Sequence, residues 1–139
     1  MSSSGGKAAE LRKLSCAGAC KGDVPKLGKD ELEKNLEDLP AWEVSEDHTK
    51  ISRKFVCKNF VAAIDFFNQV KDLAEAESHH PDLHLTGYRN VQVDLQTHSV
   101  GGVTLPDVVM AAKLDALPVT YSPKWLREHG SQQPGQAPA

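Results

Sequence analysis

The sequence has few cysteines, no excess of positive charge and no long apolar run, and each shortage argues against one class of protein. Its three cysteines, Cys16, Cys20 and Cys57, would leave one unpaired in any disulfide framework, which indicates a reducing compartment. The formal net charge of −3 argues against direct binding to nucleic acid, which needs a basic surface. No apolar run reaches the roughly 20 residues that cross a bilayer. We therefore expect a cytoplasmic protein, with a mitochondrial or plastid location as the alternative for a trimmed precursor.

Length and composition indicate one globular domain with two polar ends. The chain has 139 residues, of which 40% are hydrophobic and 25% charged, as in ordinary soluble domains. We expect a flexible arm over residues 1–24, a folded domain over 25–129 and a disordered Gly/Pro/Gln tail over 130–139. Cys16 and Cys20 are either a metal or redox pair or two reduced thiols, and the sequence leaves both open. Cys57 closes an apolar strand pattern and is expected to be buried.

Hydrophobic periodicity predicts the order of the elements. A period of two indicates strands, and a period of 3.6 indicates helices. In chain order we expect a helix at 30–36, strands at 41–45 and 50–56, a long helix from 59, strands at 83–85 and 90–97, and a helix after Thr104 at 105–116. This order, α-β-β-α-β-β-α, predicts an α+β fold with two layers, in which a four-stranded antiparallel sheet carries three helices on one face.

The long helix and the sheet each have a predicted inner and outer side. On the helix, the expected inner face is Phe60, Ala63, Ile64, Phe67, Val70 and Ala74. Phe66 and Leu73 fall off this face, seven residues apart, and are expected to meet a helix of another subunit. On the sheet, the face that carries Lys54, Gln92 and Asp94 is expected to be open to solvent or to a partner subunit.

The residues most typical of chemistry lie where the long helix must end. Residues 75–82 include His79 and His80, and Pro81 stops the helix there because proline has no N–H to donate. A third histidine, His98, comes at the far end of the following strand. Histidine exchanges protons near neutral pH, so three histidines near one point predict a proton-transfer site.

Four interpretations of these histidines compete. His79 and His80 are common residues at a helix C-terminus, where a cation complements the helix dipole. A metal site would use His79, His80, His84 and His98, but Pro81 breaks the helix between His80 and His84. Nucleophilic catalysis lacks a serine or cysteine in a recognisable arrangement. General acid–base catalysis needs neither a metal nor a cofactor.

A longer motif favours the acid–base interpretation. The pattern is Glu75-xxx-His79-His80-Pro81-Asp82, Tyr88, His98, Gly101-Gly102-Val103-Thr104 and Asp107, preceded by Leu39-Pro40-Ala41-Trp42. It resembles the signature of the pterin-4a-carbinolamine dehydratases over about residues 32–116. The resemblance implies dehydration of a 4a-hydroxytetrahydropterin to the quinonoid dihydropterin, which recycles the cofactor spent by aromatic amino-acid hydroxylases.

The resemblance also assigns roles to residues. It implies His79 and His98 as the acid–base pair, His80 as a pterin-binding residue, Trp42 as a wall of the pocket, and Glu75 and Asp107 as supporting or orienting groups. It implies a pterin substrate, no metal, no cofactor and no membrane. Strict alternation points His98 away from the helices, so the site must lie at the end of the strand.

Two departures from the family pattern concern the rim of the pocket. Leu83 stands where many members carry an aromatic residue, and the segment from His80 to Tyr88 is one residue longer than in the animal proteins. Members of the family also act as dimerisation cofactors of a homeodomain transcription factor or in assembly, so a non-catalytic binding module is the alternative function. The resemblance and an exposed strand edge together predict a homodimer or homotetramer.

Overall fold

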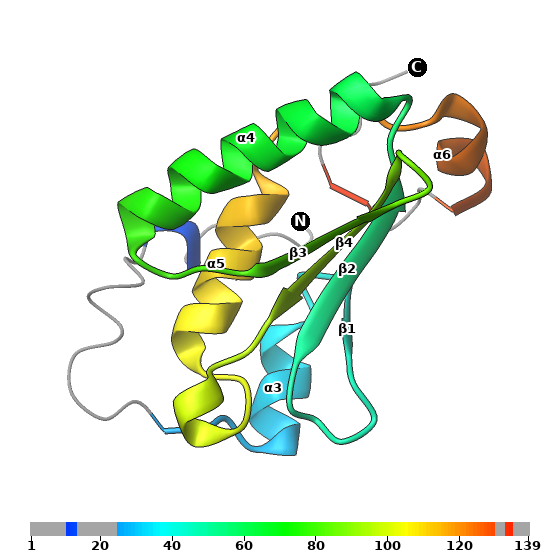
Figure 1. The fold of residues 1–139 in the computed structure, drawn as a ribbon. Coiled ribbons are helices and arrows are strands. Elements are labelled where there is room, and N and C mark those ends of the chain that lie inside the picture. Colours follow the sequence, from blue (N-terminus) through cyan, green and yellow to red (C-terminus); the bar gives the residue numbers. More distant parts are fainter. Residues whose placement is uncertain (1–10, 14–24, 130–132, 135–139) are drawn as a thin grey trace.

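The computed structural model describes residues 11–13, 25–129 and 133–134, and within them it has the predicted α+β architecture (Figure 1). The elements are α3 (Lys29–Asn35), β1 (Trp42–Val44), β2 (Ile51–Val56), α4 (Phe60–Glu77), β3 (Asp82–Thr86), β4 (Asn90–Leu95), a 3₁₀ turn η1 (His98–Val100), α5 (Leu105–Asp115) and α6 (Pro123–His129). The four strands form one antiparallel sheet in the order β1-β2-β4-β3. The prediction of three helices missed α6, a short helix opened by Pro123.

Alternation along β2 sorts its side chains between the two faces of the sheet. Ile51, Arg53 and Phe55 are buried, whereas Ser52 and Lys54 lie on the other face. The buried face lies against the helices, and Phe55 packs edge-on against Phe66 of α4 with ring centroids 5.1 Å apart. Figure 1 shows α4 and α5 against the same side of the sheet. The two layers therefore meet at this apolar face, as predicted.

The buried face of α4 differs from the prediction. The buried residues of α4 are Ala63, Phe66, Val70 and Ala74. Phe60 is 52% exposed, and Phe66, predicted to face another subunit, is 1% exposed. Leu73 is partly buried against the same core. The proposed stripe of Phe66 and Leu73 for a partner helix is therefore wrong, because the 3- and 4-residue steps from Ala63 place Phe66 over Phe55.

Helix α5 is buried on nearly every side rather than along one stripe. Its residues from Pro106 to Ala112 are all buried, as are Leu114 and Asp115, whereas Ala116, predicted on the inner face, is exposed. A helix that is enclosed all round cannot shift without disturbing the core. The polar groups at its two ends are consequently held in fixed positions.

A buried charge cluster lies beside the C-terminal end of α5. The Arg53 side chain is fully buried and donates from Nη1 to Asp115 Oδ1 at 3.2 Å and from Nη2 to the Tyr121 hydroxyl at 2.7 Å. The Trp42 indole N–H donates to the same Asp115 oxygen at 2.9 Å. A buried charge needs such partners, since an isolated one would pay a large desolvation penalty. The cluster ties β1, β2 and α5 together.

The ends of the chain are described only in part. Cys16, Cys20 and most of the predicted arm and tail lie outside the described residues. Leu11 is buried, and the neighbouring Arg12 donates from Nε to the carbonyl of Ala112 at 2.9 Å. Cys57 is buried as predicted, and burial raises the pKa of its thiol to about 11 although Arg53 acts in the opposite direction. No helix in the described part of the chain is both long enough and apolar enough to span a membrane.

Candidate active site

The end of α4 brings His79 into position. The helix ends with Ser78 in the left-handed conformation at φ 54°, and the backbone N–H of His79 bonds back to the carbonyl of Ala74 at 3.2 Å. Pro81 follows at once, so the chain leaves the helix and enters β3, as the sequence predicted. This abrupt turn directs the His79 side chain toward the start of α5.

Asp107 meets His79 from the first turn of α5. The Asp107 carboxylate is fully buried, and its Oδ1 lies 2.6 Å from Nε2 of His79. Thr104 caps this helix, and its backbone N–H donates to Asp107 Oδ2 at 2.9 Å in the predicted capping box. His79 and Asp107 are 28 positions apart in the chain, and the cap of α5 fixes Asp107 beside His79.

A threonine pair occupies the second oxygen of Asp107. The Thr97 hydroxyl donates to Asp107 Oδ2 at 2.8 Å and lies 2.9 Å from the Thr104 hydroxyl. With Oδ2 occupied by these donors, Oδ1 remains for His79. A carboxylate only accepts hydrogen bonds, so His79 donates from Nε2–H and its Nδ1 keeps a free lone pair. Sequence reasoning missed Thr97, whose only signal was its place at the end of a strand.

His98 follows Thr97 directly and is exposed. Strand β4 ends at Leu95, two residues earlier than predicted, and His98 opens the 3₁₀ turn η1. The turn closes through hydrogen bonds between Thr97 and Gly102, so the backbone of this segment returns toward α5. The side chain is thereby freed from the alternation of the strand, as the sequence argument required. Through Thr97, the segment that carries His98 is linked to Asp107.

His80 and Glu75 form a second imidazole–carboxylate pair at the surface. His80 Nε2 lies 2.6 Å from Glu75 Oε2, and the two side chains are 61% and 72% exposed. Water screens such a pair, so its contribution to stability is small. Both side chains are accessible to a bound molecule.

Trp42, predicted as a wall of the pocket, contacts the far end of α5 instead of the His79–Asp107 pair. It is 4% exposed and bonds to Asp115, eight residues along α5 from Asp107. Eight residues of helix span about 12 Å. The indole is part of the buried charge cluster and packs in the core.

His84, considered with the other histidines as a metal ligand, points elsewhere. Its Nε2 lies 2.9 Å from Asp94 on the other face of the sheet. His79, His80 and His84 thus each bond to a different carboxylate. Among the described residues, no three histidine, cysteine or acidic side chains form a group that could hold a metal ion.

Comparisons with known proteins identify the family. The family model described as pterin 4 alpha carbinolamine dehydratase matches residues 25–117. A putative pterin-4-alpha-carbinolamine dehydratase of Rubrobacter xylanophilus is 43% identical over 78% of this chain and 98% of that protein. The mitochondrial pterin-4-alpha-carbinolamine dehydratase 2 of Arabidopsis thaliana is 35% identical over 80% of this chain and 60% of that protein. A crystal structure described as a transcriptional coactivator/pterin dehydratase from Brucella melitensis has a TM-score of 0.61 and 36% identity, and it covers 66% of this chain and 96% of that one.

The fold and the site together define a class: an α+β protein with histidines held at the junction of a helix end, a strand end and a capped helix. The family model, which matches residues 25–117, then identifies the family within this class. The chain belongs to the pterin-4-alpha-carbinolamine dehydratase family, whose named activity is that of a hydro-lyase.

Proposed function

We propose that the protein dehydrates a 4a-hydroxytetrahydropterin to the quinonoid dihydropterin, with histidines as the general acid and base. The observation that carries this proposal is the buried contact between His79 and Asp107, which leaves the Nδ1 lone pair of His79 available. A positioned imidazole of this kind contributes typically 10²–10⁴-fold to a proton-transfer step.

In the proposed step, the bond between C4a and the hydroxyl oxygen breaks and water leaves. The acid donates a proton to the departing oxygen, and the base removes a proton from a ring nitrogen, so no net proton is consumed. His79 accepts the proton at Nδ1, because Asp107 holds its Nε2–H. His98, exposed to solvent on η1, donates a proton to the departing oxygen and regains a proton from water.

The remaining predicted residues support binding in this proposal. His80 and Glu75 are exposed and contact the pterin, whose ring offers both hydrogen-bond donors and acceptors. Trp42 acts from the core: its bond to Asp115 fixes α5, and α5 in turn carries Asp107. Its effect on turnover is therefore indirect. Recycling of the cofactor of aromatic amino-acid hydroxylases is the physiological role that this reaction serves.

The test is an assay of the recombinant protein with the carbinolamine generated by a hydroxylase. We expect the protein to accelerate its loss above the spontaneous rate, and to do so equally after exhaustive chelation. No acceleration would eliminate the enzyme proposal. It would favour the alternative, a binding or assembly module, to which the description of the Brucella melitensis structure as a coactivator gives support.

Histidine variants test the roles. His79→Ala and His98→Ala should each lower kcat by about 10²–10⁴-fold, because each removes one proton-transfer group. His80→Ala should mainly raise KM, as expected when binding alone is lost. His48→Asn in the β1–β2 turn is the matched control, since asparagine tolerates the φ of 58° there. An unchanged kcat in both of the first two variants would refute the chemistry.

We also propose a homo-oligomer and a cytoplasmic location. Strand β3 is an edge of the sheet with Leu83 at 37% exposure, and α4 exposes Phe60 and Val61 near its start. Unpaired edges and exposed apolar side chains are typical interfaces. Light scattering should give a multiple of 15.1 kDa, and a monomer would contradict the proposal. Fractionation of cells that express the natural gene tests the location.

A further inference from the structure

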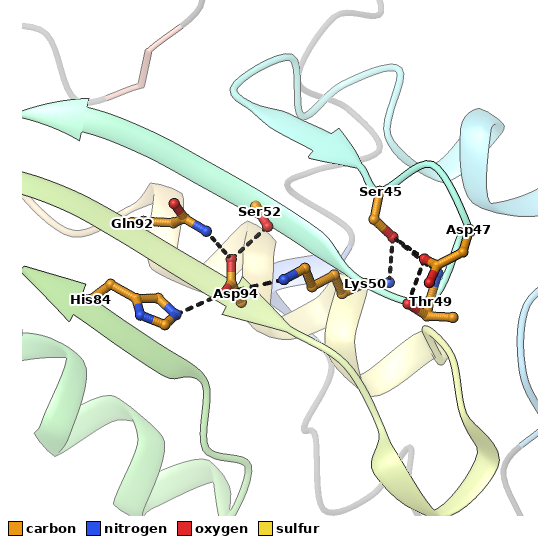
Figure 2. Close-up of polar contacts among 8 residues, drawn as sticks. All are labelled: Ser45, Asp47, Thr49, Lys50, Ser52, His84, Gln92 and Asp94. Atoms are coloured by element: carbon orange, nitrogen blue, oxygen red, sulfur yellow. Dashed lines mark hydrogen bonds and ion pairs between the residues drawn. The ribbon is translucent and has the colours of Figure 1, made fainter.

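The face of the sheet opposite the helices carries a buried carboxylate that the proposed reaction does not use. Asp94 lies on the face that was expected to be open to solvent or to a partner subunit, yet its own exposure is only 4%. The Ser52 hydroxyl and the Gln92 amide donate to its Oδ1, and His84 and Lys50 approach its Oδ2 at 2.9 and 3.8 Å (Figure 2). Asp94 is buried on this face because these neighbours cover the carboxylate.

The contacts of Asp94 keep it charged and hold His84 in one orientation. Burial by itself raises the pKa of Asp94, but the hydrogen bonds from Ser52, Gln92 and His84, with the charge of Lys50, lower it below its usual range. His84 donates from Nε2–H to this carboxylate, so its other ring nitrogen remains for a further partner. Half of the His84 side chain is exposed, at 52%.

Next to His84 is a cavity of about 380 Å³. Its polar lining consists of Lys54, His84, Thr86, Asn90 and Gln92, and Trp125 of α6 contributes an aromatic side chain. The register pairs Lys54 with Gln92 and Gln92 with His84, so these three lie in one row across β2, β4 and β3. Cavities of this size and mixed lining are typical of small-molecule sites.

The charged residue in the described lining of the cavity is a cation, Lys54. Among its described lining residues there is no carboxylate, and Lys54 makes no ion pair with any described residue. The nearby carboxylate of Asp94 pairs with Lys50 at 3.8 Å and accepts a hydrogen bond from His84. An anionic group placed beside Lys54 would therefore meet an uncompensated cation, with the Thr86 hydroxyl and the Asn90 amide as further donors in the lining.

Trp125 is held by two aromatic neighbours. Its ring stacks with those of Tyr121 and His129, with nearly parallel planes and centroid separations of 6.1 and 5.4 Å. Trp125 also lines the cavity, so a ring of a ligand has an aromatic partner there.

We infer that this cavity is a second ligand site, which takes a small aromatic anion. The ring packs against Trp125, and the carboxylate or phosphate binds the Lys54 ammonium and the donor groups of Thr86 and Asn90. The site is separate from the candidate active site, because His84 projects from the open face of the sheet whereas His79 bonds to Asp107 on the helical side.

The experiment is calorimetric titration of the full chain with three probes of one ring system. Naphthalene-2-carboxylate and 2-naphthyl phosphate carry the two candidate anions, and neutral 2-naphthamide is their uncharged counterpart. We expect one or both anions to bind at micromolar to millimolar concentration and the amide to bind at least about tenfold more weakly, since a charge-assisted hydrogen bond is lost. The stronger of the two anions identifies the natural headgroup.

Variants locate the site. Lys54→Gln and Trp125→Leu should each weaken anion binding by about tenfold. Lys71→Gln is the control, because Lys71 is equally a surface lysine but lies on α4 in an exposed pair with Asp72. His79→Ala should leave anion binding unchanged, which separates this inference from the proposed function.

Three results would overturn the inference: no binding of either anion at millimolar concentration, equal binding of the amide, or the same affinity in Lys54→Gln as in Lys71→Gln. Loss of binding in His79→Ala would show that the probe occupies the candidate active site instead. Circular dichroism of each variant verifies that the fold is retained.

Discussion

Replacing Asp107 by asparagine tests whether this carboxylate positions the base. In the protein as it stands, Oδ1 accepts from His79 at 2.6 Å, and Oδ2 accepts from Thr97 and from the Thr104 backbone at 2.8 and 2.9 Å. Asparagine has one oxygen and one amide nitrogen. The oxygen remains with Thr97 and Thr104, whose groups donate, so the amide nitrogen faces His79.

An amide nitrogen donates, so His79 must accept at Nε2 and carry its proton at Nδ1. The lone pair that the proposed chemistry uses is then turned away from the substrate. A hydrogen bond to a charged group is worth about 1.5–3 kcal/mol, which corresponds to a kcat lower by about 10- to 100-fold. The helix cap survives because the oxygen still accepts from Thr104, so the loss of stability should stay near or below about 1 kcal/mol.

Two measurements check this prediction. The carbinolamine assay gives kcat, and nitrogen NMR of the labelled imidazole reports which ring nitrogen of His79 carries the proton. Asp47→Asn is the matched control, because Asp47 also accepts from two hydroxyl side chains, those of Ser45 and Thr49, but has no histidine partner. An unchanged tautomer together with an unchanged kcat in Asp107→Asn would refute the positioning role.

Two further predictions concern stability. Arg53→Met should lower the free energy of unfolding by about 3–5 kcal/mol in urea, because Asp115 loses its buried cation. Adding Asp115→Asn to this variant should restore part of the lost stability. A double variant no more stable than Arg53→Met would contradict the explanation. For Asp94 the folded-state pKa lies below its usual value of 3.8, so its contribution is present above that value and is lost as pH falls through the lower one. The urea midpoint of the natural protein should therefore fall more than that of Asp94→Asn between about pH 5 and about pH 2, and parallel curves would argue against it.

The order of the elements could be predicted from the sequence because it depends on local patterns. Alternation predicted Ile51, Arg53 and Phe55 on one face of β2, and all three are buried there. The long helix ended before Pro81, with Glu77 as its last residue, and the spacing of Thr104 and Asp107 predicted the capping box that the structure contains. In each case the signal lies within a few neighbouring residues, where steric and hydrogen-bonding rules act directly.

Other features depended on packing between distant segments. Apolar spacing predicted that Phe67 faces inward and Phe66 does not, but packing against Phe55 buries Phe66. Period-two alternation placed Asp94 on the open face correctly, but only the register with β2 and β3 brought Ser52 and His84 over it. Such choices are made by side chains that are far apart in the chain and that no local pattern connects.

The candidate site shows the same division. The residue types, with the family resemblance, predicted histidine acid–base chemistry at the end of the long helix, and this chemistry stays a proposal. The sequence alone did not connect Thr97 with Asp107, nor did it place Trp42 away from the histidines and against Asp115. Those positions follow from the way α5 is enclosed, because a helix buried on nearly every side fixes the groups at both of its ends.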